Sequence, residues 1–184
     1  MRIIGGIHKG YVLNQPRLEP TRPTTDLAKE ALFNIIDNYF NFDNIRFLDL
    51  FGGTGNISLE FGSRGCTDIT TVELHSKAIE FMTKTSEKLN LEGHRILQTD
   101  VFDYIENCRE TYDIIFAGPP YKLPNLASIP DLILQKGMIE GQGWFIMEHD
   151  PKYNFDQHPH LWKRRNYGQT NFSIFVNEIQ EKGQ

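Results

Sequence analysis

Arg46–Glu60 reads Arg-Phe-Leu-Asp-Leu-Phe-Gly-Gly-Thr-Gly-Asn-Ile-Ser-Leu-Glu. Its first half is apolar and predicts a strand, and its second half predicts the start of a helix. Between the two lies a turn crowded with Gly52, Gly53 and Gly55. Glycine has no Cβ, so a ligand can lie against bare backbone at the helix N-terminus. The stretch therefore predicts a ligand-binding turn, with Asp49 near the end of the strand.

Alternating strands and helices follow this turn. Strands are expected at 69–73, 95–98, 112–117, 144–148, 161–167 and 171–179, and helices at 27–40, 56–64, 76–89, 101–107 and 126–136. Ser76 is expected to cap the third helix, and Gly137, Gly141 and Gly143 to separate the last helix from the next strand. This order predicts an α/β fold, a Rossmann-like, seven-stranded and mostly parallel sheet with an antiparallel C-terminal hairpin. Ligands bind such sheets at the carboxyl ends of the strands.

The N-terminal residues predict a separate small unit. Residues 2–14 suggest two short β segments around a glycine-rich turn, too small to be stable alone. Prolines at 16, 20 and 23 exclude a helix there, and Thr24 or Thr25 is a suitable N-cap for the next helix. We therefore expect a hairpin and linker at 1–22 and a larger α/β domain at 23–184.

Composition limits the class of protein. The chain has 184 residues, 39% hydrophobic and 23% charged, which suits one globular domain. No apolar run is long enough to span a bilayer, and no signal peptide is evident. Cys66 and Cys108 are isolated, so we expect neither a disulfide framework nor a zinc site. We expect a cytoplasmic monomer without a metal.

The charge is unevenly distributed. The chain carries a net charge of −5, yet residues 1–22 have four basic residues against one acid and residues 163–184 four against two. Solvated surface charge is the simpler interpretation. A basic arm can nevertheless bind phosphates despite an acidic total. Lys163, Arg164 and Arg165 lie on one predicted strand, where alternate residues face opposite sides, and are better explained as protection of a sheet edge.

The ligand of the glycine turn is ambiguous from the turn alone. It lacks the full G-x-G-x-x-G pattern, so a dinucleotide is weakly supported. Glu73 follows the next strand, where an acid binds ribose hydroxyls of NAD or of S-adenosylmethionine alike. Asp49 ahead of the glycines disfavours a pyrophosphate, and Gly118-Pro119-Pro120-Tyr121 at a later strand end has no role in hydride transfer. Both features favour S-adenosylmethionine.

These motifs resemble a known family. Leu-Asp-Leu-Phe-Gly-Gly-Thr-Gly, Val72-Glu73 and Asp100 resemble the first three motifs of class I methyltransferases, and Ala-Gly-Pro-Pro-Tyr resembles the Asp/Asn-Pro-Pro-Tyr/Phe motif of amino-group methyltransferases. With Arg-Ile-Ile-Gly-Gly and Thr-Arg-Pro-Thr-Thr-Asp-x-x-Lys-Glu-Ala-Leu-Phe-Asn, the chain resembles the RsmD-like family. That family methylates the exocyclic N2 of a guanine in small-subunit (16S) ribosomal RNA.

The resemblance implies how S-adenosylmethionine is held. Glu73 would accept hydrogen bonds from the ribose hydroxyls and Asp100 from the adenine amino group, while Asp49 would act through the turn or the cofactor ammonium. The complete expected cofactor set is Asp49, Phe51, Gly53, Thr54, Gly55, Glu73, Leu74, Asp100, Val101 and Phe102.

The resemblance also implies a catalytic segment, Gly118, Pro119, Pro120 and Tyr121. A guanine amino group is a poor nucleophile, and the family flips the base out, stacks it on an aromatic ring and accepts hydrogen bonds from the amine. Tyr121 would stack the base. Gly118 departs from the family, because the acceptor side chain of Asp or Asn is missing there. Loss of one such group costs about 10²–10³ in rate, so we expect Gly118→Asp to raise methyl transfer.

The expected RNA contacts come from Arg2, Lys9, Arg17, Arg22 and Thr24, and the expected partner is small-subunit RNA or an assembling 30S particle. Three other functions stay open: a non-catalytic RNA-binding or assembly factor, a dinucleotide-dependent oxidoreductase, and a DNA or small-molecule N-methyltransferase. His158 and His160 could suggest a metal, but no other ligand accompanies them at suitable spacing.

Overall fold

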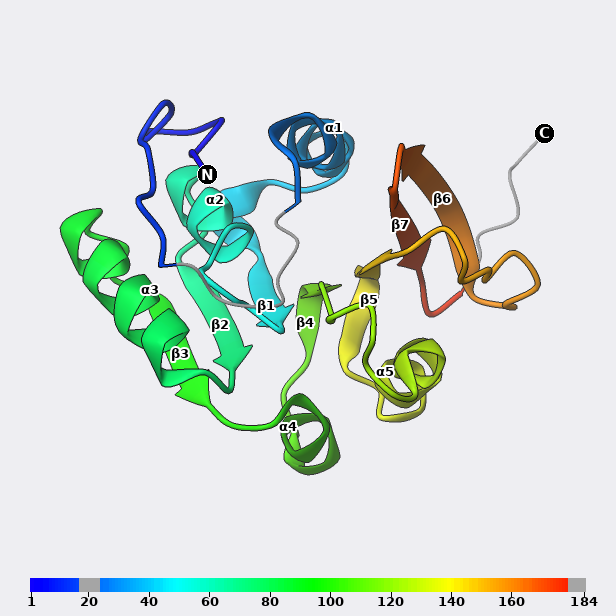
Figure 1. Ribbon diagram of the computed structural model, residues 1–184. Coiled ribbons are helices and arrows are strands. Elements are labelled where there is room, and N and C mark those ends of the chain that lie inside the picture. The colour runs from blue at the N-terminus through cyan, green and yellow to red at the C-terminus, as the bar shows by residue number, and fades with distance from the viewer. Residues whose placement is uncertain (17–23, 179–184) are drawn as a thin grey trace.

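The computed structural model describes residues 1–16 and 24–178, which form a seven-stranded sheet with helices on both faces (Figure 1). The strand order is β3-β2-β1-β4-β5-β7-β6, with the first five strands parallel and β7 and β6 antiparallel. The strands are β1 (Arg46–Leu50), β2 (Asp68–Glu73), β3 (His94–Gln98), β4 (Tyr112–Ala117), β5 (Ile139–His149), β6 (Leu161–Tyr167) and β7 (Thr170–Phe175). The predicted fold class is confirmed, and β6 is an edge strand as its three basic residues suggested.

The helices are α1 (Asp26–Asp37), α2 (Ser58–Ser63), α3 (Ser76–Lys88), α4 (Val101–Asn107) and α5 (Ile129–Gln135), with short 3₁₀ helices at Phe42–Asn44 and Leu126–Ser128. Thr25 is the N-cap of α1, and its hydroxyl accepts a hydrogen bond from the Ala28 amide. Among the helices described, none has the length and apolar character needed to cross a membrane.

Two apolar cores lie on the two faces of the sheet. One packs α1 against residues such as Phe47, Ile114 and Ile146, and the other packs α4 and α5 against their strand neighbours, including Leu48 and Ile115. In the central strands β1, β4 and β5, successive apolar residues alternate between these cores, as the pleat requires. The sheet is therefore covered on both faces, and its carboxyl edge is where side chains can meet a ligand.

The start of α3 differs from the sequence expectation. His75, not Ser76, is the N-cap, and no side chain caps this helix. The reason is that Glu73 accepts the Leu74 and His75 amides, which fixes the turn one residue earlier.

Strand β5 is longer than expected and runs through Gly141 and Gly143. A Cβ at Gly143 would lie 2.5 Å from the Asp113 carbonyl oxygen, so glycine permits close approach of the neighbouring strand. The pairing of β4 with β5 also shifts register between Tyr112 and Ile114. Glycine here marks an irregular strand and not a loop.

The two segments of the N-terminal hairpin pair through one β-bridge, between Arg2 and Val12, and through hydrogen bonds from the Ile3 amide to the Tyr11 carbonyl and from the Leu13 amide to the Met1 carbonyl. Other amides of the hairpin donate to α2, among them that of Ile4 to the Glu60 side chain and that of Ile7 to the Ser63 carbonyl. Ile3 and Leu13, among others, pack with side chains of α2 and α3. As expected of a segment too small to fold alone, the hairpin rests on the domain.

Candidate active site

A cavity lies at the carboxyl ends of β1, β4 and β5, where the sequence predicted a ligand. Its lining is formed by Gln15, Pro16, Thr24, Asp49, Phe51, Gly52, Gly53, Thr54, Asn56, Ile57, Phe116, Gly118, Pro119, Tyr121 and Glu148. The glycine turn and the Pro-Pro-Tyr segment, far apart in sequence, therefore border the same space. Parallel pairing of β1 with β4 brings their carboxyl ends together.

The glycine turn exposes backbone to this cavity. Gly53 has φ +55°, and a Cβ built there would have as its nearest neighbour the Phe51 carbonyl oxygen at 4.0 Å. Gly55 has a different role: its φ is +82°, and a Cβ would lie 2.9 Å from Met82 of α3. Gly53 thus leaves room for a ligand, whereas Gly55 lets α3 pack closely. Thr54 donates to Gln15 at 2.5 Å, which places the N-terminal segment against the turn.

Glu73 is buried beside the turn at the end of β2. Its Oε2 accepts the Gly53 amide at 2.7 Å, and its Oε1 accepts the amides of Leu74 and His75, each at 2.8 Å. A carboxylate has about four acceptor sites. Glu73 therefore holds the turn in shape and retains acceptor capacity for a ligand hydroxyl. Neither Glu73 nor Leu74 is among the residues that line the cavity.

Asp49 lies beneath the turn at the start of a buried chain of polar groups. Ser58 Oγ donates to Asp49 Oδ2 at 2.5 Å and lies 2.6 Å from Thr71 Oγ1. Thr71 Oγ1 is 2.7 Å from His94 Nε2, and His94 Nδ1 is 2.7 Å from Ser86 Oγ. Burial lowers the pKa of His94 to about 4. A neutral imidazole donates at one nitrogen and accepts at the other, so the chain of hydrogen bonds is continuous.

Burial raises the pKa of Asp49 to about 7; the hydrogen bonds from Ser58 oppose this, and the carboxylates of Glu73 and Glu148 add to it. Asp49 is consequently poised between its neutral and charged forms near neutral pH. A cationic ligand group in the cavity would favour the charged form.

Asp100 is the N-cap of α4, a position that aspartate commonly takes. Its Oδ1 accepts the amides of Phe102 and Asp103, at 2.8 and 3.3 Å. Val101 is buried among apolar side chains between α4 and the sheet. Asp100, Val101 and Phe102 lie at the same sheet edge as Glu73 but outside the cavity lining.

The segment after β4 is divided between the cavity and its surroundings. Gly118, Pro119 and Tyr121 line the cavity, whereas Pro120 is exposed and does not. A Cβ at Gly118 would lie 3.2 Å from the Phe116 ring and 3.9 Å from Glu148 Oε2. The space facing residue 118 is therefore bordered by a ring and a carboxylate.

Glu148 and Thr24 join this wall of the cavity. Thr24 Oγ1 donates to Glu148 Oε2 at 2.5 Å, and the Asn56 side chain donates to the Thr24 carbonyl at 3.3 Å. Glu148 was missed as a site residue, although it ends a predicted strand just as Glu73 does. Gln15 and Phe116 also line the cavity, and no sequence motif pointed to either one.

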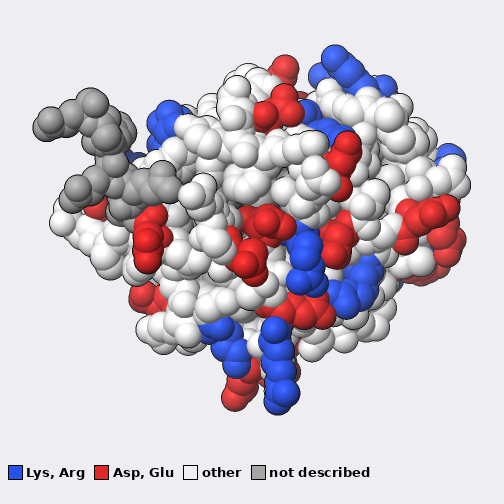
Figure 2. Space-filling model, turned by 180° about the vertical axis from the view of Figure 1, so that it is seen from behind, with Lys and Arg blue, Asp and Glu red and all other residues white. Residues whose placement is uncertain are grey.

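The expected RNA contacts are dispersed. Arg2 pairs with Asp26 at 2.7 Å against α1, Lys9 is exposed at the hairpin tip, and Arg17 and Arg22 lie outside the described residues. On the face shown in Figure 2, Lys and Arg side chains are interspersed with Asp and Glu. The basic side chains on that face therefore lie among acidic ones and do not form one large positive surface.

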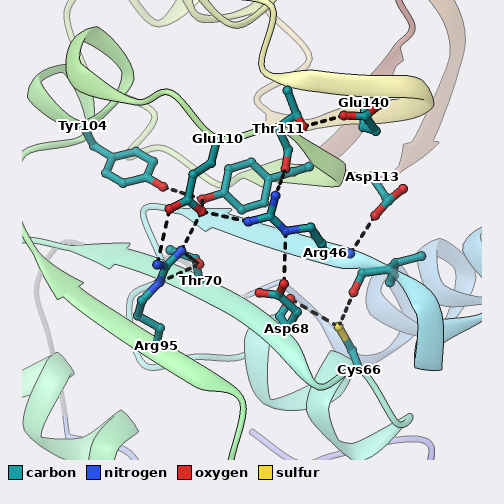
Figure 3. Close-up of polar contacts among 12 residues, drawn as sticks. Arg46, Cys66, Asp68, Thr70, Arg95, Tyr104, Glu110, Thr111, Asp113 and Glu140 are labelled. Carbon is teal, nitrogen blue, oxygen red and sulfur yellow. Dashed lines mark hydrogen bonds and ion pairs between the residues drawn. The ribbon is translucent and has the colours of Figure 1, made fainter.

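A charged network crosses the opposite, amino edge of the sheet (Figure 3). Arg46 contacts Asp68 at 3.1 Å and Glu110 at 2.9 Å, and Arg95 contacts Glu110 at 2.8 Å. These groups are partly exposed, so each pair contributes little stability, although a network contributes more. These charged side chains pair with one another across neighbouring strands, away from the cavity.

His158 and His160 do not form a metal site with other side chains. His158 Nε2 lies 3.2 Å from Asp131, and His160 Nδ1 lies 3.0 Å from the Val176 carbonyl oxygen. Across residues 1–16 and 24–178, no group of three or more His, Cys, Asp or Glu side chains is arranged to hold a metal ion.

Known proteins resemble this chain over nearly its full length. The family described as "Conserved hypothetical protein 95" matches residues 1–176. YlbH of Bacillus subtilis is 34% identical over 182 residues, covering 95% of this chain and 98% of YlbH. Ribosomal RNA small subunit methyltransferase D of Escherichia coli is 25% identical, covering 98% of this chain and 91% of that protein.

The fold has a close counterpart among solved structures. A hypothetical protein of Thermus thermophilus superposes with a TM-score of 0.84 and 26% identity, covering 96% of this chain and 99% of that one. The sequence relatives and the structural neighbour agree with the methyltransferase motifs that border the cavity. The chain belongs to the RsmD-like family of class I, S-adenosylmethionine-dependent methyltransferases that act on small-subunit ribosomal RNA.

Proposed function

We propose that this protein methylates the exocyclic N2 of a guanine in 16S ribosomal RNA. The observation that carries the proposal is that one cavity is bordered by the glycine turn, with Gly53, and by the Pro-Pro-Tyr segment, with Tyr121. A methyl donor on the first and a flipped base on the second would lie close together. Placing the two reactants side by side contributes much of the acceleration in such transfers.

The residues of the turn fit S-adenosylmethionine, which supplies a reactive methyl group when bound. Gly53 offers unobstructed backbone, Asp49 offers a carboxyl group beneath it for a cationic amino acid moiety, and Glu73 has acceptor capacity for ribose hydroxyls. Asp100, Val101 and Phe102 at the adjoining strand end would contact the adenine. Phe51, Thr54, Gly55 and Leu74 complete the proposed cofactor set.

The substrate side of the cavity fits a flipped base. Tyr121 would stack on the guanine, with Gly118 and Pro119 beside its amino group. Thr24 borders the same space, and Arg2, Lys9, Arg17 and Arg22 would bind RNA phosphates as part of an arm formed by residues 1–22. The rest of the chain, 23–184, would be the catalytic domain. We further propose a cytoplasmic monomer that needs no metal and acts on naked RNA or an assembling 30S particle.

A second function is favoured by Gly118: an RNA-binding or assembly factor that keeps the fold and the cofactor but does not transfer methyl groups. Two measurements separate these functions. The first is calorimetric titration with S-adenosylhomocysteine and, in parallel, NADH; the second is transfer of labelled methyl groups to small-subunit RNA. Cofactor binding with transfer supports the enzyme, binding without transfer supports the assembly factor, and binding of NADH alone supports an oxidoreductase.

A further inference from the structure

The missing side chain at residue 118 faces another carboxylate. Strands β4 and β5 are parallel neighbours, and their last recorded pair is Ala117 with Met147. The next residues, Gly118 and Glu148, therefore lie side by side, and their side-chain positions face the same side of the sheet.

Distances support this equivalence. A Cβ at Gly118 would lie 3.9 Å from Glu148 Oε2, whereas the carboxylate oxygens of an aspartate lie about 2.4 Å from its own Cβ. Glu148 Oε2 is thus within about one bond length of the region that an aspartate at 118 would fill. Both residues line the same cavity.

Glu148 is held in this position by a chain of buried contacts. It is 5% exposed, and Thr24 Oγ1 donates to its Oε2 at 2.5 Å. Asn56 donates to the Thr24 carbonyl at 3.3 Å, and the buried Lys29 ammonium donates to the Asn56 side chain at 2.9 Å. A buried carboxylate fixed in this way is a preorganised acceptor, which is the property that transition-state stabilisation requires.

We propose that Glu148 is a catalytic residue that accepts a hydrogen bond from the target amine and replaces the acceptor absent at Gly118; this rests on the function proposed above. The nitrogen lone pair forms the new bond to the methyl carbon, and the electrons of the breaking carbon–sulfur bond stay on sulfur. The surplus proton on nitrogen passes to the Glu148 carboxylate and then to water.

This assignment revises the expected effect of Gly118→Asp. In the natural chain the new carboxylate would stand beside Glu148, and like charges at this distance repel. Its Cβ would also press on the Phe116 ring at 3.2 Å. The substitution should help only when Glu148 is removed.

The test is a cycle of four proteins: the natural chain, Glu148→Ala, Gly118→Asp and the double variant. Single-turnover methyl transfer should fall about 10²–10³-fold in Glu148→Ala. Adding Gly118→Asp should raise the rate of the Glu148→Ala variant by at least about tenfold and change the natural chain by less than about threefold. The affinity for S-adenosylhomocysteine should stay within about twofold throughout, which shows that each variant folds.

Glu140→Ala is the matched control, because Glu140 lies on the same strand and also accepts a threonine hydroxyl, that of Thr111, at 2.5 Å. It is exposed and lies at the far end of β5. Its rate should equal that of the natural chain.

A binding measurement gives a second readout. Once the methylated guanosine has been mapped, RNA with inosine at that position lacks the amine. The natural chain should bind the guanosine RNA more tightly than the inosine RNA, and Glu148→Ala should lose this preference. Equal rates for Glu148→Ala and the natural chain, or equal gains from Gly118→Asp in both backgrounds, would overturn the assignment. If mapping instead finds the methyl group on an adenine amine, the proposed function is wrong, but the comparison of the four proteins still tests the role of Glu148.

Discussion

Lys29 Nζ lies 3.2 Å from Glu60 Oε2, and both side chains are completely buried. Lys29 also donates to the Arg2 carbonyl at 2.7 Å and to Asn56 at 2.9 Å, and Glu60 accepts the Ile4 amide at 2.9 Å. This pair therefore joins the N-terminal hairpin, α1 and α2 beneath the cavity. Glu60 also pairs with Arg64, one turn further along α2, at 2.9 Å, so the carboxylate is held between two cations.

Lys29→Met should destabilise the protein by about 1–3 kcal/mol, because Glu60 Oε2 loses a buried partner and the Glu60 carboxylate then pairs only with Arg64, at 2.9 Å. Urea unfolding at neutral pH measures this directly. Lys84→Met is the matched control, since Lys84 pairs with Glu80 on the exposed surface of α3, and its unfolding midpoint should not move. Equal midpoints for Lys29→Met and the natural chain would show that the buried pair has no structural role.

Asp49 should make the cofactor-free protein less stable as pH rises. The pKa of Asp49 is raised to about 7 in the fold. Between about pH 4 and 7 Asp49 therefore stays protonated in the folded protein but ionises in the unfolded chain, so the free energy of unfolding falls as the pH rises. The loss is on the order of 4 kcal/mol over this window and is constant above it. Asp49→Asn lacks this titration. Urea unfolding across the pH range should show the variant gaining stability relative to the natural chain; a constant difference would contradict the assignment.

Gly53→Ala should weaken binding of S-adenosylhomocysteine by at least about tenfold, because its Cβ enters the space proposed for the cofactor. Gly137→Ala controls for backbone strain: Gly137 has φ +66°, similar to +55° at Gly53, and a Cβ there meets nothing within 4 Å. Both variants should lose similar stability, but only Gly53→Ala should lose affinity in calorimetric titration. Unchanged affinity for Gly53→Ala would place the cofactor elsewhere.

The N-terminal arm can be tested through salt dependence. Lys9→Ala and Arg22→Ala should each lower the slope of log affinity against log salt for small-subunit RNA by about one unit, because each removes one phosphate contact. Lys136→Ala, at the end of α5 on the other face of the sheet, should leave the slope unchanged. The arm has no role in binding if all three variants behave like the natural chain.

Local sequence signals predicted most of the fold. Val101–Asn107 and Tyr112–Ala117 have the bounds expected from apolar spacing and from their flanking turn residues. The hairpin was less predictable, since the Ile4 and Ile7 amides bind α2, which is distant in sequence. The local propensity of the hairpin residues cannot show that these amides will donate to α2 and not to the opposite segment of the hairpin.

The candidate site was predictable where a motif marked it, as at Gly53 and Tyr121. Glu148 carries the same signal as Glu73, an acid ending a strand, but its importance depends on the strand order that places β5 beside β4. The cap on α4 shows a different case, because Asp100 has a local role that its position before a helix already indicated. Strand order and the side-chain contacts that follow from it are tertiary properties, and a single sequence motif does not specify them.

The most direct test of the proposed function is methyl transfer to small-subunit particles, and to the RNA extracted from them, from cells that lack this modification. The RNA would be digested after incubation with the protein and labelled S-adenosylmethionine, and its nucleosides mapped by mass spectrometry. We predict one labelled nucleoside, N2-methylguanosine, at one position of 16S RNA. Absence of label, or label only on adenosine or another atom of guanosine, would contradict the proposed function.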